Sequence, residues 1–215
     1  HKAIRRQRQM CIRDRSGIGK GLLFGLVCSV FAYTVECIVL LFLHGNVHLS
    51  FYASGFSLTN EKVSQAGILL ILSSVLFNLI NVWMEEGIFR GLFTKILEGL
   101  SYRKSLFFIA FLFGVWHLVM PLRDYLQGES SLVNLIAMGI GYVILAGMMS
   151  IKWSLLYKIT GSLWFGLGDH FFNNLASNLV HVVSNSEADS LQIVRILLWQ
   201  LLSFAIVLWV YQKKN

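Results

Sequence analysis

Six long apolar segments are the feature that most constrains this chain of 215 residues. They lie at about 21–43, 63–84, 104–120, 132–151, 161–183 and 191–211. A helix needs roughly 20 residues to cross the ~30 Å hydrocarbon core of a bilayer. The segments are continuously apolar rather than alternating, and only helices and closed barrels satisfy their backbone hydrogen bonds in lipid. The sequence therefore predicts an all-α polytopic membrane protein with about six transmembrane helices.

The composition agrees with a membrane protein. Hydrophobic residues make up 56% of the chain and charged residues 13%, whereas about 25% of the residues in a soluble domain are charged. These values exclude a disordered chain and an ordinary soluble enzyme. The three cysteines, Cys11, Cys28 and Cys37, show neither C-x-x-C nor Cys/His spacing. They therefore predict no disulfide framework and no structural zinc site.

The net charge of +7 belongs almost entirely to residues 1–20, which we interpret as a basic tail before a membrane domain at 21–215. The tail holds seven Lys or Arg and one Asp, and the other 195 residues hold 11 positive and 10 negative charges. Within the tail, RQMCIRDRS resembles translated sequencing-adapter sequence rather than native protein, so we infer no function from it. We expect the lipid bilayer, and no nucleic acid, as a partner.

The distribution of Lys and Arg between the apolar segments predicts the orientation. Connections on the cytoplasmic side carry an excess of these residues. If the N-terminus is inside, the outside connections hold only Lys62 and Arg123. The inside connections then hold Lys95, Arg103, Lys104, Lys152, Lys158, Lys213 and Lys214. The sequence thus predicts a multi-pass protein with both termini in the cytoplasm.

Several polar residues lie within the apolar segments, where ionisable groups are costly and are functional candidates by default. The second segment continues as a helical pattern to about 97 and contains Glu85, Glu86 and Arg90. Residues four apart share a helix face, so Glu86 and Arg90 can neutralise each other. Glu85 is rotated by ~100° from Glu86 and remains available for chemistry.

Two further segments carry histidines at comparable depth. At ~1.5 Å per residue from the predicted cytoplasmic ends, Glu85 lies ~15 Å deep, His117 ~20 Å and His170 ~14 Å. The three side chains can therefore meet in one layer of the membrane. Phe113 shares a face with His117, and Asn174 shares a face with His170.

This set of side chains is suited to hydrolysing a peptide bond. A glutamate and a histidine can polarise a water molecule and transfer its proton. A second histidine and an asparagine amide can donate hydrogen bonds to a developing oxyanion. Alternatively, Glu85, His117 and His170 could hold a zinc ion with an open position for water.

The spacing of these residues resembles that of a known family, the CPBP intramembrane proteases, which include CAAX proteases, bacteriocin-processing enzymes and Abi proteins. Three motifs carry the resemblance, in the order that the family has: E-E-x-x-x-R at Glu85, Glu86 and Arg90, F-x-x-x-H at Phe113 and His117, and H-x-x-x-N at His170 and Asn174. They cover a catalytic core at about residues 63–183.

The resemblance implies a fold, a reaction and roles for these residues. It implies a CPBP/Abi-type helical core and an endopeptidase in which Glu85 is the base on water, assisted by His117. It places His170 and Asn174 around the oxyanion and makes Glu86, Arg90 and Phe113 supporting residues. The implied substrates are membrane-associated peptides or proteins, such as prenylated proteins and precursors of bacteriocins or pheromones. The adapter-like start and the size of six helices favour a prokaryotic Abi-type protein, and hence a prokaryotic plasma membrane as its location. Zinc is the expected metal if Glu85, His117 and His170 bind one.

Other readings of the sequence lead to different predictions. A non-proteolytic immunity or binding protein could use the same residues to sequester a peptide, and a proton-coupled transporter could use them as a relay. Gly166–Asp169 spells G-x-G-D, as in presenilin-type aspartyl proteases, but the other aspartates, Asp14, Asp124 and Asp189, lie outside the apolar segments. That dyad is therefore not expected.

The remaining polar and small residues fit structural roles. Asn173 and Asn178 are typical of contacts between membrane helices, and Trp116 of packing. Gly87 and Gly91 have the spacing of close helix contact. Glu36 has no obvious partner in the sequence, and His181 is expected in solvent at the end of its segment.

Overall fold

The computed structural model describes residues 15–53 and 68–214, and helices dominate it. Helix α2 (Arg15–His44) is followed by strand β1 (His48–Phe51). The second segment contains α3 (Ile68–Glu85), a π-helix η1 (Glu86–Leu92) and α4 (Phe93–Ile96). The later elements are α5 (Tyr102–Trp116), α6 (Val119–Leu126), α7 (Leu132–Thr160), α8 (Leu163–Leu179), β2 (Val180–Ser184), β3 (Glu187–Ala188) and α9 (Gln192–Lys214).

Each of the six apolar segments contains a long helix, which confirms the all-α membrane fold. By length and composition, five helical stretches can cross a membrane: Ser16–His44, Ile68–Ile96, Tyr102–Leu126, Leu132–Thr160 and Gln192–Lys214. The fifth apolar segment differs from them, because α8 has 17 residues and carries the polar residues of the third motif.

Two helices have bounds that differ from those of the predicted segments. Helix α2 already begins at Arg15, so residues 15–20 of the predicted tail are helical, while residues 1–14 lie outside the described part of the chain. The fifth segment stops being helical at Leu179, and its last residues form β2. Val180 and the residues after it are β-branched or polar, and β2 pairs antiparallel with β1, which replaces the helical hydrogen bonds.

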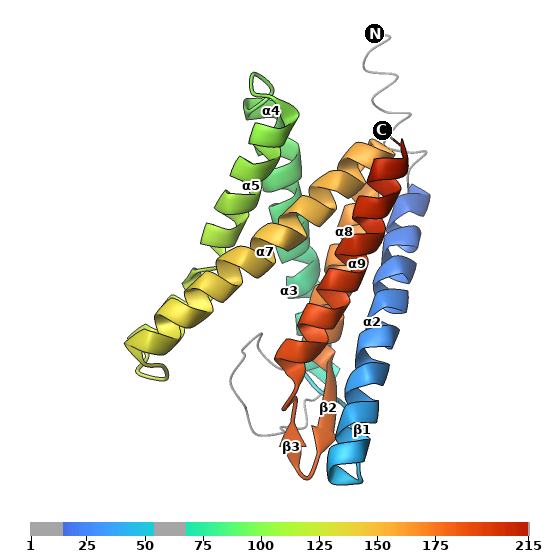
Figure 1. Cartoon of the computed structure of the whole chain (residues 1–215), viewed down its shortest axis with the longest axis vertical. Helices are drawn as coiled ribbons and strands as arrows, with labels where there is room; N and C mark the ends of the chain where they lie inside the picture. Colours follow the sequence, from blue (N-terminus) through green and yellow to red (C-terminus); the bar gives the residue numbers. More distant parts are fainter. Residues whose placement is uncertain (1–14, 54–67, 215) are drawn as a thin grey trace.

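The helices form two groups that meet at α7 and α8 (Figure 1). Helices α2, α8 and α9 lie side by side, and α7 crosses them obliquely to pack against α5. Helix α2 begins and α9 ends at one end of the bundle, and the three strands lie at the other end. The assignment of the first end to the cytoplasm stays a prediction.

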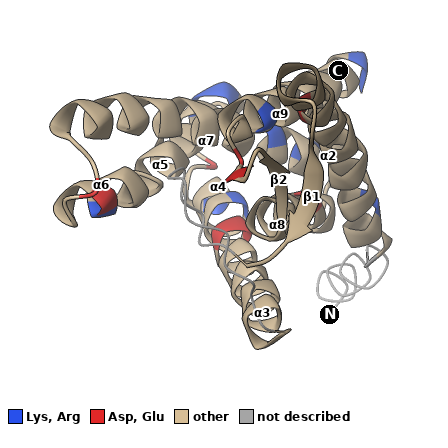
Figure 2. Cartoon of the chain, turned by 90° about the horizontal axis from the view of Figure 1, so that it is seen from below, with Lys and Arg blue, Asp and Glu red and all other residues tan. Residues whose placement is uncertain are grey.

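The exterior of the bundle is apolar and its interior is partly charged. Phe42 and Ile144 are 87% and 67% exposed, and many other large apolar side chains on α2, α3, α5, α7 and α9 are also exposed. In the view from below, the ribbon is coloured for charged residues between α7, α8 and α9 (Figure 2). The side chains of Lys152, Asp169 and Arg195 are buried. This inverted distribution is typical of an integral membrane protein, whose exterior contacts lipid.

Glycines allow α2 and α8 to approach closely. A Cβ atom on Gly21 would lie 2.1 Å from the Phe165 carbonyl oxygen, and one on Gly168 would lie 2.3 Å from the Ile18 carbonyl oxygen. Only glycine fits at such a distance. The predicted close contact at Gly87 is wrong, since a Cβ there would meet no described atom within 4 Å. The glycines of α8 thus place its polar residues against the bundle.

A buried charge network joins the sheet to the helices. His181 Nδ1 lies 2.5 Å from Asp189 Oδ2, and the His181 ring stacks on Tyr52 with the ring centroids 3.8 Å apart. Arg195 binds Asp189 at 2.9 Å and Glu36 at 2.6 Å. The expectation of a solvated His181 is therefore wrong, and Glu36 has a partner that comes from α9.

The network predicts a stability that depends on Asp189 ionisation. Burial alone raises the pKa of Asp189, but the hydrogen bond from His181 and the charge of Arg195 hold this pKa below its ordinary 3.8. A depressed aspartate pKa stabilises the folded state above the unfolded-state pKa, and this contribution is lost as pH falls through the folded-state pKa. We expect Asp189→Asn to lower thermal stability at neutral pH, with a difference from wild type that narrows as pH falls below about 4.

Thermal unfolding of the detergent-solubilised proteins from about pH 7 to about pH 3 measures this difference. A gap between wild type and Asp189→Asn that stays constant over the whole range would contradict the assignment.

Candidate active site

The first motif lies where an α-helix changes into a π-helix. Glu85 is the last residue of α3, and Glu86 and Arg90 lie in η1. Single π-helical turns within α-helices are frequent at functional sites. Arg90 Nη1 lies 3.4 Å from Glu86 Oε1, and both side chains are almost fully buried. The predicted ion pair is thus confirmed, and Glu85 does not share it.

Glu85 has one oxygen held and one oxygen without a donor. Its side chain is buried, and Oε1 accepts a hydrogen bond of 3.2 Å from the indole nitrogen of Trp116. Oε2 lies 3.4 Å from His170 Nε2 and accepts no hydrogen bond within the described chain. Trp116 therefore contacts the carboxylate directly, in addition to the packing role that the sequence predicts.

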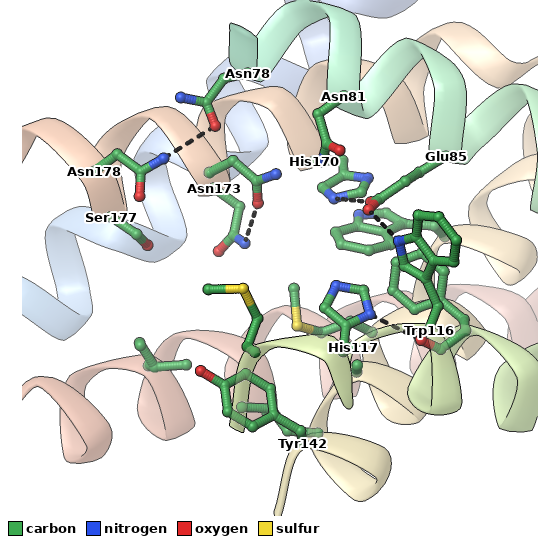
Figure 3. Close-up of a pocket in the computed structure, with 18 of the residues that line it drawn as sticks. Asn78, Asn81, Glu85, Trp116, His117, Tyr142, His170, Asn173, Ser177 and Asn178 are labelled. Atoms are coloured by element: carbon green, nitrogen blue, oxygen red, sulfur yellow. Dashed lines mark hydrogen bonds and ion pairs between the residues drawn. The ribbon is translucent and has the colours of Figure 1, made fainter. Parts of the chain in front are cut away.

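His170 lies between the two glutamates, and Figure 3 shows its contact with Glu85. Its Nδ1 is 2.9 Å from Glu86 Oε1, and its Nε2 faces Glu85. The ring stacks on Trp153 of α7, with the centroids 3.7 Å apart and the planes 17° apart. Both nitrogens thus face carboxylates, and the predicted oxyanion role of His170 stays a prediction.

His117 presents one ring nitrogen to the site. It follows the last residue of α5, and its Nδ1 lies 2.8 Å from the Phe113 carbonyl oxygen. Since a carbonyl can only accept, Nδ1 carries the proton and Nε2 of the neutral ring is a proton acceptor. The Phe113 ring is buried between the His117 ring, 4.6 Å away, and the Arg90 guanidinium, also 4.6 Å away. Phe113 thereby supports both motifs.

The predicted catalytic residues line one cavity of about 310 Å³. Glu85, His117, His170 and Asn174 all contribute to its wall, as the common depth along the helices predicts. Glu85, Trp116, His117 and His170 lie together at one end in the close-up (Figure 3). The rest of the described wall includes asparagines that the sequence analysis did not select, Asn78 and Asn81.

A buried ion pair supports the cavity wall from behind. Asp169 Oδ2 lies 2.8 Å from Lys152 Nζ and accepts a hydrogen bond of 2.8 Å from the Trp153 indole. Lys152 also donates to Gln200 at 3.0 Å, and Gln200 donates to Asn173 at 2.6 Å. Lys152 was expected in a cytoplasmic connection but is fully buried in α7. Asp169, the aspartate of the G-x-G-D sequence, is thus paired with a cation.

The predicted zinc ligands Glu85, His117 and His170 line the same cavity without forming a metal-ligand group. Among the described residues, no three His, Cys, Asp or Glu side chains are grouped as metal ligands. His170 directs its nitrogens to two glutamates, and His117 directs Nδ1 to a backbone carbonyl. Zinc binding therefore stays a prediction for experiment.

The Lys152–Asp169 pair gives a prediction about stability. Removing one partner of a buried ion pair leaves an uncompensated charge, at a cost of about 3–5 kcal/mol. We expect Lys152→Met to lower the melting temperature of the solubilised protein strongly and Lys152→Met/Asp169→Asn to recover part of the loss. Lys158→Met, at an exposed position of the same helix, is the control. A double variant as unstable as Lys152→Met would contradict the pairing.

Comparison with known proteins identifies the family. The family model described as Rce1-like, type II CAAX prenyl endopeptidase, matches residues 67–176, just over half of the chain. The matched segment extends from the start of α3 into α8 and contains all three motifs. No curated protein and no solved structure matches the chain. With the motifs in one cavity and the family model spanning them, the chain belongs to the Rce1-like type II CAAX prenyl endopeptidases, within the CPBP family that the sequence resembles.

Proposed function

We propose that this protein hydrolyses a peptide bond within the membrane, with Glu85 as the general base. The observation that carries the proposal is the buried Glu85 carboxylate in the cavity wall. Trp116 holds one of its oxygens, and the other accepts no hydrogen bond within the described chain. A buried carboxylate with one oxygen held in place is well suited to orient and deprotonate a water molecule.

In the proposed reaction, Glu85 accepts a proton from water and the hydroxide attacks the carbonyl carbon of the scissile bond. The carbonyl oxygen becomes an oxyanion, to which the Asn174 amide can donate a hydrogen bond. The proton held by Glu85 then passes to the leaving nitrogen, and the C–N bond breaks. His117 assists by accepting a hydrogen bond from the water at Nε2, and the Glu86–Arg90 pair positions the carboxylate. In this proposal His170, whose ring nitrogens face Glu85 and Glu86, also positions the carboxylate and takes this role in place of the expected oxyanion contact.

The substrate class follows from the family and from the site. Proteases of this family act on membrane-associated peptides or proteins. We propose a substrate anchored at the membrane, with a prenylated cysteine-containing C-terminus as the first candidate, because the matching family is described as CAAX prenyl endopeptidases. Precursors of bacteriocins or pheromones are the second candidate. A mainly apolar cavity with a set of polar side chains along its wall can receive the peptide of either class.

Glu85→Gln tests the general base. The amide has nearly the same shape but cannot take up the proton, and positioned acid–base groups contribute about 10²–10⁴-fold to a rate. We expect cleavage of a prenylated peptide in proteoliposomes to fall by at least about 10²-fold, and His117→Ala and His170→Ala to abolish it as well. Glu98→Gln, at an exposed position, is the matched control.

The same variants separate the proposal from its alternatives. Full cleavage by Glu85→Gln would overturn the role of Glu85. A sequestering protein would bind peptide without cleaving it in the wild type, and a transporter would move protons without any peptide product. Comparison of membrane peptides from wild-type and Glu85→Gln cells would then identify the natural substrates.

Chelation tests the dependence on metal. The proposed reaction uses Glu85 as the base, and the described residues contain no group of metal ligands. We therefore expect the purified enzyme to keep its activity after exhaustive treatment with a chelator. Activity and metal content are measured on the same sample. Activity that is lost on chelation and restored by zinc would replace the proposed mechanism with a metalloprotease mechanism.

A further inference from the structure

The catalytic cavity continues into a part of its wall that the proposed reaction does not use. Asn78, Asn81, Ser177 and Asn178 line the same cavity as Glu85 and His170. In the close-up, Asn78, Ser177 and Asn178 lie at the end away from Trp116 and His117 (Figure 3). These side chains are polar and uncharged, and no Lys or Arg belongs to the described wall of the cavity.

The asparagines form two rows on neighbouring helices. On α3, Asn78 and Asn81 precede Glu85 by seven and four residues, so they share its face. On α8, Asn174 and Asn178 follow His170 by four and eight residues and also share one face. The two rows run antiparallel, because Glu85 contacts His170 at one end and the Asn178 amide donates to Asn78 Oδ1 at 3.0 Å at the other.

The length of these rows corresponds to a short peptide. At ~1.5 Å per residue, they extend about 10–12 Å from the Glu85–His170 end. An extended peptide advances about 3.3 Å per residue, so about three residues fit along the rows.

The chemistry of the rows matches a peptide main chain. An asparagine amide carries donors and an acceptor, which are the groups that backbone C=O and N–H require. Asn78 donates to the Ser74 carbonyl oxygen at 2.8 Å and to Ser74 Oγ at 3.2 Å and accepts from Asn178, so a peptide binds to Asn78 by replacing or sharing one of these bonds. A substrate peptide that enters a membrane protein in an extended form leaves those groups unpaired, and burial without partners is costly. Asn81 has no hydrogen-bond partner among the described residues, so its amide is available to a ligand.

We propose that Asn78, Asn81 and Asn178 form a subsite that binds the main chain of about three extended substrate residues next to the scissile bond. The proposal rests on the proposed proteolytic function and adds the residues that bind the main chain of the substrate. The subsite recognises peptide bonds rather than particular side chains.

The competing explanation is that these asparagines only join the helices. The Asn78–Asn178 hydrogen bond does link α3 to α8. Asn81 makes no such link within the described chain, so Asn81→Ala is the main variant and Asn78→Ala the second. Asn134→Ala, at an exposed position in the first turn of α7, is the matched control.

The experiment uses a fluorescent peptide with a farnesylated cysteine followed by three residues, and two analogues in which one of the last two peptide bonds is an ester. An ester removes one N–H donor without changing the chain length. With wild type, we expect at least one ester to raise KM by about tenfold, as for the loss of one good hydrogen bond. Asn81→Ala should raise KM for the all-amide peptide by a similar factor, leave kcat within about twofold, and reduce the additional effect of that ester.

Either of two results would overturn the subsite: KM values for Asn81→Ala and Asn78→Ala within twofold of wild type, or ester effects that are the same in wild type and variants. A purely structural role would lower the amount of folded protein without changing the ester effect.

Binding of the same three peptides to Glu85→Gln, measured by fluorescence anisotropy, separates this proposal from the proposed function. If the wild type does not cleave but Glu85→Gln binds the all-amide peptide more tightly than an ester analogue, the proposed function fails and the subsite stands. Equal affinities for all three peptides would overturn the subsite.

Discussion

The rest of the structure depends on the pairing of buried charges across helices. In a bilayer no water compensates a charge, so each ionised side chain needs a partner of opposite charge or a hydrogen-bond donor. Glu86 has Arg90 and His170, Asp169 has Lys152, and Arg195 joins Glu36 to Asp189. The Glu86–His170 and Glu36–Arg195 contacts connect helices that are far apart in the sequence, and the Lys152–Asp169 pair connects the consecutive helices α7 and α8. The buried charges thus also link the helices to one another.

Glu85 differs from these charges because no lysine or arginine within the described chain forms an ion pair with it, which leaves it available as a base. Arg90 forms its ion pair with the neighbouring Glu86. His170 contacts Glu86 through Nδ1, and its ring stacks on Trp153. Glu85 thus faces the cavity with one oxygen fixed by Trp116 and one without a donor in the described chain. Two adjacent glutamates have different roles because their partners differ.

The cavity combines this charged end with a neutral polar end. A reaction on a peptide bond needs a base at one point and partners for the main chain on either side of it. Asparagines supply such partners without adding charge, which keeps the cost of burial low. We propose one substrate type, an extended peptide at the membrane. The family membership, the environment of Glu85 and the two rows of asparagines each favour it.

The sequence by itself determined the membrane helices, the three motifs, the family and the Glu86–Arg90 pair, because apolar length and helical spacing are local properties. It did not reveal the change from helix to strand after Leu179, which depends on pairing with β1. Only the tertiary structure assigned Lys152 to Asp169, Trp116 to Glu85 and Glu36 to Arg195, and showed Asn78 and Asn81 in the cavity wall. These contacts join different helices, and no local spacing specifies which faces of two helices meet.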